Sequence, residues 1–429
     1  MTDAQAPDYQ YAETLRRNGK YADAVEQFAR LWQQAPSPSV GWRYAACLRR
    51  TGQLQKAQKI AAEALAKYPE DEYIKSQMAW ILYEMELRPA HEASDLGRVV
   101  HYAKRILELN SDRITLVRVA HVVMKVAKSR KKWNVLLEWA DRLTPDDLNN
   151  KPMTFDGRRG MSDLETWYVG RARALLELGR FDEARRFAQD GLKALPNEIY
   201  LLRTAALALA KSGDLSGGIA EMRRLLTHRR ADWYMKAELA DLEYKVGNLD
   251  EAYRLICDAV SDPRQADEYK LEYFVTLARI ALELGKLNVA AAHATWVRMI
   301  RSGHGWTIPP EVMQVEKDVL AAFQAANQTR PELPKDIRQL AALCRRYWQE
   351  GKREGLQFYR GTIKPYPEGR PFTFIKRDDG GEEVYVAVRD LPKNCGQPGS
   401  RVEFTLKKGY DQKRARESLQ ATDVRCVNE

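Results

Sequence analysis

The sequence lacks the long apolar segments that would place it in a membrane or a secretory pathway. No run of about 18 apolar residues occurs anywhere in its 429 residues, which argues against a membrane-spanning helix. The first ten residues are polar and acidic and contain no apolar signal core. We therefore expect no membrane partner and a cytoplasmic location.

Cysteine is scarce and scattered. No two cysteines form a C-x-x-C pair, and the five lie far apart, at Cys47, Cys257, Cys344, Cys395 and Cys426. This pattern is typical of reduced thiols in a cytosolic protein and does not match the ligand spacing of a structural zinc site. The sequence thus predicts five free thiols and no bound metal.

Motifs of the common enzyme classes are absent as well. The chain has no phosphate-binding G-x-x-x-x-G-K-[ST] loop, no H-E-x-x-H, no G-x-S-x-G and no dinucleotide-binding glycine fingerprint. Its six histidines are scattered through helical segments, where ordinary helix positions explain them better than ligand or base roles. Without a catalytic constellation, we expect a protein that is not an enzyme and has no cofactor.

A moderate excess of basic residues is present. Lysine and arginine number 69 against 59 aspartates and glutamates, giving a formal net charge of +10 and a pI near 9.2. This balance is compatible with a polyanionic partner, although the charge is spread along the chain. The length exceeds that of a typical single core, so two or more structural units are expected.

Most of the chain is a tandem repeat with a period close to 34 residues. Gly19 and Gly52 are 33 residues apart, and so are Ala24 and Ala57. Small residues let paired helices approach closely, and a glycine ends a helix where a left-handed backbone is needed. The same glycine returns with spacings of 34, 34 and 38 residues at Gly179, Gly213, Gly247 and Gly285.

These six copies resemble the tetratricopeptide repeat, a helix–turn–helix unit that stacks into a superhelix. Two degenerate copies fill the gap between them. One begins near Ala79 and is stretched by residues 88–97, and the other begins near Ala120 with Trp133 after its turn. About eight repeats then cover residues 5–303. Residues 145–163 interrupt the array as a loop, either a plain insertion or a binding or hinge segment.

Members of the resembled family usually recognise peptides or partner helices on the inner surface, which the first helix of each repeat builds. Aromatic and basic residues recur on the first two such helices, at Tyr9, Arg16, Arg17, Trp42, Arg49 and Arg50. Stacking would align the two arginine pairs, and an acidic peptide or a phosphate backbone would fit there. In the alternative interpretation, these cations only stabilise helix C-termini. The family's carboxylate-clamping Lys and Asn pattern is absent, so a chaperone tail is not a favoured ligand.

After the repeats, residues 304–355 are expected to form a helical cap and a linker. Residues 309–327 show helical spacing of apolar residues, and residues 336–350 predict an amphipathic helix. The expected apolar face of this second helix carries Ile337, Leu340, Leu343 and Tyr347. From Leu356 the apolar pattern alternates, which is typical of strands and predicts an all-β unit over residues 356–429.

The terminal segment is similar to a cold-shock domain, a small five-stranded barrel of the OB type. Residues 361–375 read G-T-I-K-P-Y-P-E-G-R-P-F-T-F-I, in register with the first strands of that family. Residues 384–388, 399–404 and 421–424 match its later strands. The chain is therefore expected to be mainly α, a tetratricopeptide superhelix followed by a five-stranded OB-type barrel.

The cold-shock resemblance implies a face on which unpaired bases stack while cations hold the backbone. Carried over residue by residue, it assigns stacking to Phe372, Phe374, Tyr385 and Tyr366, and backbone contacts to Lys364 and Arg370, with Lys376 beside them. Pro365 and Ala387 replace the family's stacking Trp and its His, which predicts weaker binding. In the alternative interpretation, Phe374 and Tyr385 only fill the barrel core. Further cations expected to assist are Arg345, Arg346, Lys352 and Arg353.

Together these features favour a non-enzymatic adaptor that holds a protein partner in its superhelix and single-stranded RNA or DNA on its barrel. Two alternatives stay open. One is a pure protein–protein scaffold whose barrel no longer binds nucleic acid, and the other is a regulatory subunit of a separate nuclease or other effector enzyme. The choice between RNA and DNA and the oligomeric state also stay open.

Overall fold

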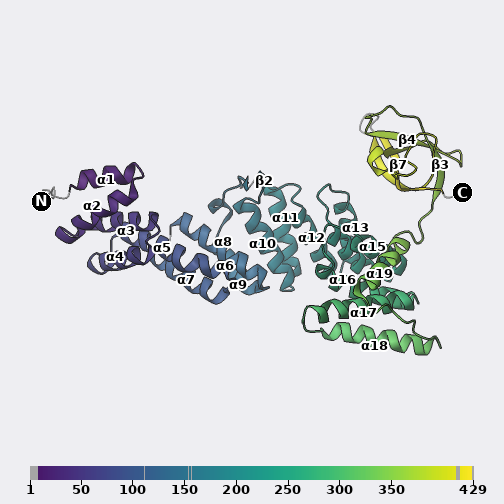
Figure 1. The fold of residues 1–429 in the computed structure, drawn as a ribbon, viewed down its shortest axis with the longest axis horizontal. Coiled ribbons are helices and arrows are strands. Elements are labelled where there is room, and N and C mark those ends of the chain that lie inside the picture. The colour runs from purple at the N-terminus through teal and green to yellow at the C-terminus, as the bar shows by residue number, and fades with distance from the viewer. Residues whose placement is uncertain (1–7, 111, 153, 156, 412–415, 428–429) are drawn as a thin grey trace. The chain divides into compact units, whose positions relative to one another are not determined.

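The chain divides into two units, residues 1–235 and 236–429. The computed structural model describes residues 8–110, 112–152, 154–155, 157–411 and 416–427 (Figure 1). The domain boundaries expected near residues 303 and 355 both fall inside the second unit. No helix in these described ranges is long and apolar enough to cross a membrane.

Helices joined by short turns build the first unit, and each packs against the next along the chain. A short hairpin of β1 (Thr154–Phe155) and β2 (Arg158–Arg159), with η2 (Pro145–Asp147) before it, occupies the predicted insertion. The helices are α1 (Tyr9–Arg17), α2 (Tyr21–Gln34), α3 (Pro38–Arg50), α4 (Leu54–Lys67), α5 (Glu72–Leu82), η1 (Tyr83–Leu87), α6 (Arg88–Glu92), α7 (Leu96–Leu109), α8 (Arg113–Ser129), α9 (Trp133–Ala140), α10 (Asp163–Glu177), α11 (Phe181–Ala194), α12 (Ile199–Lys211) and α13 (Leu215–Leu225).

The turns inside the repeats have the backbone that the glycine pattern predicts. All six repeat glycines have positive φ, between 70° and 116°. In the two degenerate copies the same place is taken by Ser94 (φ 53°) before α7 and Lys131 (φ 54°) before α9. The turn geometry therefore persists where the glycine is lost, at a steric cost that a glycine avoids. The small residues that follow, such as Ala24 and Ala57, are fully buried between helices.

The stretched third copy lengthens its first helix. After α5 the chain makes one turn of π-helix, η1, and continues as α6 before the turn to α7. The additional residues thus extend a helix, where the sequence pattern showed only a longer repeat.

Helices also form the first part of the second unit. They are α14 (Trp233–Lys245, which begins in the first unit), α15 (Leu249–Val260), η3 (Asp267–Tyr269), α16 (Leu271–Glu283), α17 (Leu287–Gly303), α18 (Pro310–Ala325) and α19 (Ile337–Gly351). Helix α19 packs against α15 and α17. Its buried face carries Leu340, Ala341, Cys344 and Trp348.

The apolar face expected for α19 is wrong in part. Ile337 is 40% exposed, and the side chain that anchors the helix is Trp348, one position beyond the expected Tyr347. Trp348 enters an aromatic cluster with Phe274 of α16 and Trp296 of α17, at ring-centroid distances of 5.5 and 5.7 Å. Helical spacing alone could not show which of two adjacent aromatic residues this cluster would accept.

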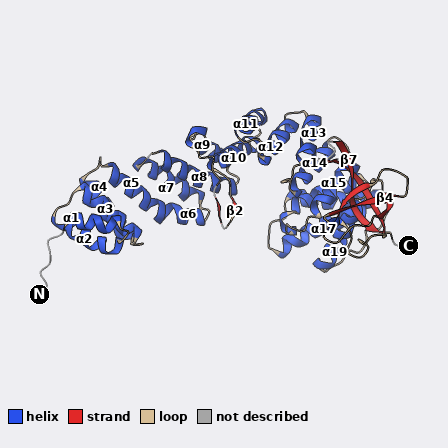
Figure 2. Cartoon of the chain, turned by 90° about the horizontal axis from the view of Figure 1, so that it is seen from above, coloured by secondary structure: helices blue, strands red, loops and turns tan. Residues whose placement is uncertain are grey.

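A closed five-stranded barrel ends the second unit, as the sequence predicted. Its strands are β3 (Tyr359–Ile363), β4 (Phe372–Arg377), β5 (Val384–Ala387), β6 (Arg401–Asp411) and β7 (Arg416–Cys426), with η4 (Val388–Asp390) after β5. The strand order is β3-β4-β5-β7-β6, antiparallel throughout except for the parallel pair β5–β7. Apart from the β1–β2 hairpin, the strands drawn red in Figure 2 all belong to this OB-like barrel. Ile363, Ile375, Val386 and Phe404 are among its buried core residues.

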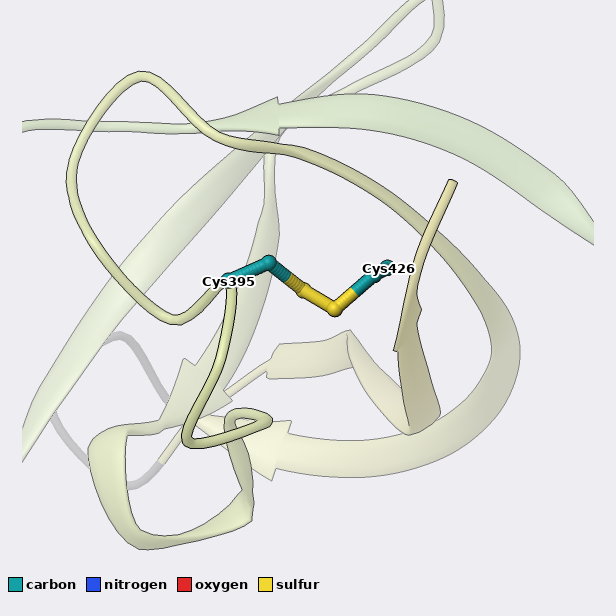
Figure 3. Close-up of a disulfide and its surroundings, with 2 residues drawn as sticks. All are labelled: Cys395 and Cys426. Atoms are coloured by element: carbon teal, nitrogen blue, oxygen red, sulfur yellow. A yellow bond between two sulfur atoms is a disulfide. The ribbon is translucent and has the colours of Figure 1, made fainter. Parts of the chain in front are cut away.

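Two of the five cysteines are not free thiols. Cys395, in the loop after η4, forms a disulfide with Cys426 at the end of β7 (Figure 3). The expectation of five thiols is therefore wrong for this pair. The two residues are 31 positions apart, and barrel closure brings them to a Cα–Cα distance of 5.6 Å, which no local spacing reveals. Cys47, Cys257 and Cys344 are free and buried in the helices.

Candidate functional site

Three aromatic rings cluster on the outer face of the barrel. Phe372 and Phe374 extend from β4, and Tyr385 lies opposite Phe374 on β5. The ring centroids are 5.5 Å apart for Phe372–Tyr385, 6.0 Å for Phe372–Phe374 and 6.3 Å for Phe374–Tyr385. We call these three rings the platform.

Strand alternation explains why the platform faces outward. Thr373 and Ile375, which alternate with the two phenylalanines, are 3% and 0% exposed and point into the barrel. The buried Thr373 hydroxyl has a hydrogen-bond partner, because it donates to the Lys364 carbonyl at 3.1 Å. Phe374 is 37% exposed, and neither it nor Tyr385 belongs to the buried core, so the core-filling alternative does not describe these rings.

The predicted cations are placed unequally around the platform. The guanidinium carbon of Arg370 lies 4.4 Å from the Phe372 ring centroid. Lys376 is exposed at the end of β4, whereas Lys364 forms an ion pair with Glu383 at 2.8 Å. Arg370 and Lys376 are therefore the more available cations, and Lys364 would have to exchange one carboxylate for a phosphate.

Tyr366 does not join the platform. Its hydroxyl donates to the Gly396 carbonyl at 2.9 Å, and its ring packs against the barrel core. It thus ties the β3–β4 connection to the loop that carries Cys395. Ala387, directly opposite Phe372 on β5, leaves no large side chain at that place.

Three of the four cations expected to assist the barrel, Arg345, Arg346 and Arg353, are engaged in ion pairs. Arg345 pairs with Asp267, and Arg346 lies 3.9 Å from Glu350. Arg353, just after α19, donates to Asp423 of β7 at 2.9 Å. Arg353 therefore tethers the linker to the barrel.

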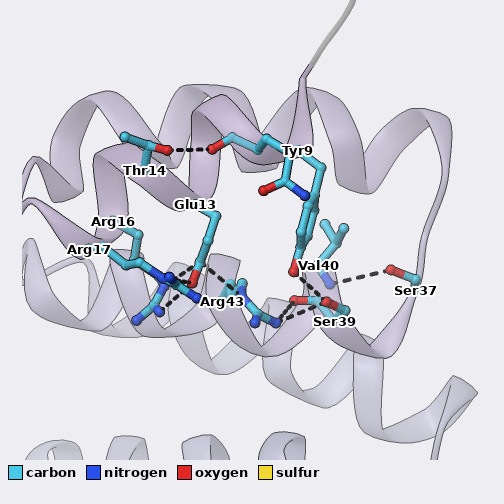
Figure 4. A network of polar contacts seen from close by, with 10 residues as sticks. Tyr9, Glu13, Thr14, Arg16, Arg17, Ser37, Ser39, Val40 and Arg43 are labelled. Carbon is cyan, nitrogen blue, oxygen red and sulfur yellow. Dashed lines mark hydrogen bonds and ion pairs between the residues drawn. The ribbon is translucent and has the colours of Figure 1, made fainter.

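The first repeats hold a buried carboxylate surrounded by three arginines, shown in Figure 4. Glu13 of α1 is 5% exposed and accepts hydrogen bonds from Arg16 at 2.7 Å, Arg17 at 2.9 Å and Arg43 of α3 at 2.9 Å. The hydrogen bond from Arg16, together with the other two guanidinium groups, lowers the pKa of Glu13 to about 2. One carboxylate thus orders three cations and leaves the cluster net positive.

Predicted partner residues meet at this cluster. The Trp42 ring has Arg43 at 4.1 Å and Arg16 at 5.3 Å from its centroid, and it stacks on Tyr73 at 5.5 Å. The Tyr9 hydroxyl bonds Ser39 Oγ at 2.7 Å. Arg43 and the 65% exposed Tyr73 were missed by the sequence pattern, because only stacking shows which face of α3 and α5 meets α1.

The second arginine pair is placed differently from the first. Arg49 forms an ion pair with Glu84 of η1, and its side chain is 12% exposed, whereas Arg50 is exposed. Arg16 and Arg49 are thus held by carboxylates of the chain itself, and Arg17, whose side chain is 72% exposed, keeps more of its surface open. The expected basic patch is therefore smaller than two aligned pairs.

Within the residues that the structure describes, no group of histidine, cysteine, aspartate and glutamate is arranged to hold a metal ion.

Residues 15–81 match the tetratricopeptide repeat family. The helices of the array form a solenoid like that of tetratricopeptide repeats. No curated protein matches the chain in sequence. Among solved structures, a tetratricopeptide repeat protein from Parabacteroides merdae is 14% identical, with a TM-score of 0.32 over 62% of this chain and 94% of that one.

Two further solved structures resemble the chain at similar levels. The C-terminal part of a repeat-containing protein from Cytophaga hutchinsonii is 14% identical, with a TM-score of 0.36 over 60% of this chain and 96% of that one. Human IFIT1, as a dimer with PPP-AAAA, is 12% identical, with a TM-score of 0.40 over 80% of each chain.

Proposed function

We propose that this protein is a non-enzymatic adaptor whose barrel binds single-stranded nucleic acid and whose repeat array binds a protein partner. The platform is the observation that supports nucleic-acid binding. Its three rings lie within 6.3 Å of one another on the outside of an OB-like barrel. Solvent-facing aromatics on a sheet are surfaces on which unstacked bases lie, and the cold-shock resemblance of the same strands points to the same ligand.

The cations of the barrel suit a phosphate backbone running beside the platform. Arg370 is held over the Phe372 ring, and Lys376 is exposed next to Phe374 on the outer side of β4. Each stacked base contributes ~1–3 kcal/mol. With Ala387 and Tyr366 contributing no further ring, we expect two or three stacked bases and moderate affinity.

The repeat array supports the second half of the proposal. Tetratricopeptide helices commonly present binding surfaces for proteins, and here Tyr9, Trp42 and Tyr73 bring aromatic surface next to the arginines around Glu13. Aromatic and arginine side chains are the residues that most often dominate protein interfaces. We also propose a cytoplasmic location, which fractionation with an antibody against the protein would test.

Binding of labelled oligonucleotides tests the proposal. Fluorescence anisotropy of a labelled uridine oligonucleotide and a labelled thymidine oligonucleotide is measured against the full chain at two salt concentrations. We expect binding that weakens as salt rises. Lysine and arginine side chains that contact phosphates displace the counterions of the nucleic acid, and added salt opposes that release. Phe372→Ala/Phe374→Ala should raise the dissociation constant at least about tenfold, since two stacking surfaces are lost.

A matched control separates stacking from general aromatic loss. Tyr269→Ala removes a ring that is 71% exposed in the helical part of the same unit, and it should leave oligonucleotide binding unchanged. Circular dichroism shows whether the double variant keeps its fold, and Phe374→Ala alone provides a milder change. If the wild-type chain binds neither oligonucleotide at low salt, the adaptor proposal fails and the pure scaffold replaces it.

A further inference from the structure

An acidic loop connects β4 and β5, the two strands that carry the platform. Residues 378–383 read D-D-G-G-E-E and place four carboxylates within six residues. All four side chains are exposed. Within the described part of the barrel, three of them form ion pairs with cations of the barrel itself. We call residues 378–383 the acidic loop.

One ion pair fixes the acidic loop at its base. Asp379 pairs with Arg377 at the end of β4 and accepts a hydrogen bond from the Gly381 N–H at 3.1 Å. The Asp378 N–H donates to the Arg360 carbonyl of β3 at 2.9 Å, which continues the β3–β4 ladder into the loop. The loop backbone is therefore ordered beside β3, and its carboxylates have defined positions.

The other two ion pairs extend from the loop to the neighbouring strands. Asp378 pairs with Arg401 at the start of β6, and Glu383 pairs with Lys364, directly after β3, at 2.8 Å. Both cations keep about half of their side-chain surface exposed, 53% for Arg401 and 45% for Lys364. Each is thus open to an external ligand but already has a carboxylate bound.

Strand register puts both cations on the same face as the platform. Arg401 lies opposite Thr362 of β3, and Thr362 lies opposite Lys376 of β4, so these three residues share one face. Lys376 is two residues from Phe374 on β4, which makes that face the outer one. The Lys364 N–H donates to the Phe374 carbonyl at 2.9 Å, so Lys364 is adjacent to the platform.

A phosphate and a carboxylate compete for the same cation, because both accept charge-assisted hydrogen bonds from guanidinium and ammonium groups. A nucleic-acid strand that continues from the platform over β3 and β6 meets two cations that the loop has neutralised. Its phosphates also approach the two loop carboxylates, which repel them. Exposed ion pairs are weak enough to exchange, so the loop limits the affinity without closing the face.

We propose that the acidic loop is an autoinhibitory element of the nucleic-acid face, in which two carboxylates hold outer-face cations until the phosphates of a bound strand replace them. This inference rests on the proposed nucleic-acid binding by the barrel and names how that binding is limited. The platform, with Arg370 and Lys376, contacts the strand first. Release of Lys364 and Arg401 then extends the bound track across β3 and β6.

Removal of the two carboxylates should strengthen binding. The probe is the labelled uridine oligonucleotide, and its anisotropy is measured against the full chain at several salt concentrations. Asp378→Asn/Glu383→Gln should lower the dissociation constant at least about fivefold, because two cations become free for phosphates and two repelling charges are lost. The logarithmic salt dependence should steepen by about 1.4, since each phosphate contact with a single strand contributes ~0.7.

A neighbouring carboxylate provides the matched control. Glu382→Gln removes one exposed charge of the same loop that lies outside the three ion pairs, and it should change the dissociation constant by less than about twofold. Glu383→Gln alone should give part of the gain. These variants alter exposed side chains, so circular dichroism should show an unchanged fold.

Loss of the two cations tests the mechanism in a double-mutant cycle. In the chain with an intact loop, Lys364→Gln/Arg401→Gln should weaken binding by less than about threefold, because the loop already neutralises both side chains. Combined with Asp378→Asn/Glu383→Gln, the same change should cancel the gain in affinity.

Three results would overturn the inference while the proposed function stands. Asp378→Asn/Glu383→Gln binds no more tightly than the wild type, or Glu382→Gln produces the same gain, or the gain survives the loss of Lys364 and Arg401. If neither the wild type nor the loop variant binds, both proposals fail. Binding by the loop variant alone supports the inference, and the adaptor proposal for the wild type then fails.

Discussion

At Gly361 of β3 the neighbouring strand leaves no room for a side chain. A Cβ atom at this residue would lie 2.4 Å from the Lys376 carbonyl oxygen and 2.7 Å from the Ile375 side chain. The carbonyl belongs to the backbone of β4, which pairs with β3. Any side chain here must push the two strands apart or break their hydrogen bonds.

We predict that Gly361→Ala lowers the free energy of unfolding of the barrel by about 2 kcal/mol, the usual cost of overpacking. Chemical denaturation followed by near-ultraviolet circular dichroism measures the change. Gly303→Ala is the matched control, because a Cβ there meets no atom within 4 Å. Equal stability of the two variants would contradict the prediction.

Glu13 is the residue on which the first two repeats depend electrostatically. Glu13→Gln removes the negative charge that three arginines share, and should lower the free energy of unfolding by about 3 kcal/mol at pH 7. Urea denaturation measures this loss. Glu183→Gln, at an exposed carboxylate that pairs with Arg180, is the control and should have little effect.

The lowered pKa of Glu13 also predicts how the stability of the protein changes at acid pH. The pKa of Glu13 is about 2 in the folded chain, below its ordinary value of 4.5. Its contribution to stability is therefore complete above about pH 4.5 and is lost as the pH falls toward 2. Titration of Glu13 near 4.5 in the folded protein, followed by carboxyl NMR, would show that the arginines do not stabilise it.

At the scale of elements, the docking of α19 depends on one buried histidine. His293 of α17 is fully buried, its Nδ1 donates to the Val289 carbonyl at 2.7 Å, and its Nε2 accepts from Trp348 Nε1 at 2.7 Å. A proton on Nε2 would face the Trp348 N–H directly. Burial also disfavours the charged imidazolium, and it lowers the pKa of His293 to about 4.

The docking of α19 should therefore weaken in mild acid. Because the folded pKa lies below the ordinary 6.5, the unfolded chain binds the proton more readily. The stabilisation is complete above pH 6.5 and is lost as the pH falls toward 4, by up to about 3 kcal/mol. Imidazole NMR of the folded protein should show no His293 titration above pH 5, and a midpoint near 6.5 would contradict this.

The hydrogen bond itself can be tested at neutral pH. Trp348→Phe keeps an aromatic ring in the cluster but leaves His293 Nε2 buried without a donor, which should cost about 1–2 kcal/mol. Hydrogen exchange in α19 should rise in this variant. Arg346→Gln, on the exposed side of the same helix, should leave exchange unchanged.

At the scale of the whole molecule, the disulfide should affect the stability of the barrel in the second unit and of no other part. The Cys395–Cys426 bridge closes a loop that spans 31 positions and contains β6 and β7. Reduction should destabilise the barrel by about 3.5 kcal/mol, because the unfolded chain regains the conformational entropy that the closed loop removes. Hydrogen exchange with and without a thiol reductant should show faster exchange in β3–β7 and no change in α1–α13. Equal protection of the barrel in both states would contradict the prediction.

The remaining cysteines provide an internal control for that experiment. Burial raises the pKa of the Cys47 thiol to about 12 and also raises those of Cys257 and Cys344. These three thiols should resist alkylation in the folded chain whether or not the reductant is present. Mass spectrometry should then find two alkylated cysteines after reduction, both in the barrel.

The sequence by itself determined what depends on local periodicity. The 34-residue period and its glycines predicted the repeats and their turns, because the left-handed φ at each turn is a property of one residue. The alternation of β4 likewise predicted that Phe372 and Phe374 share a face, because successive side chains of a strand point to opposite sides. The mainly α array and the shared face of the platform were predictable on this basis, whereas the closed terminal barrel was predicted from the cold-shock resemblance.

Only the tertiary structure decided which distant side chains meet. The Cys395–Cys426 bridge, the third arginine at Glu13, the packing of Tyr366 against the barrel core and the anchoring of α19 by Trp348 each join residues from separate elements. Such contacts depend on how helices stack and how a sheet closes, and local spacing carries no information about either.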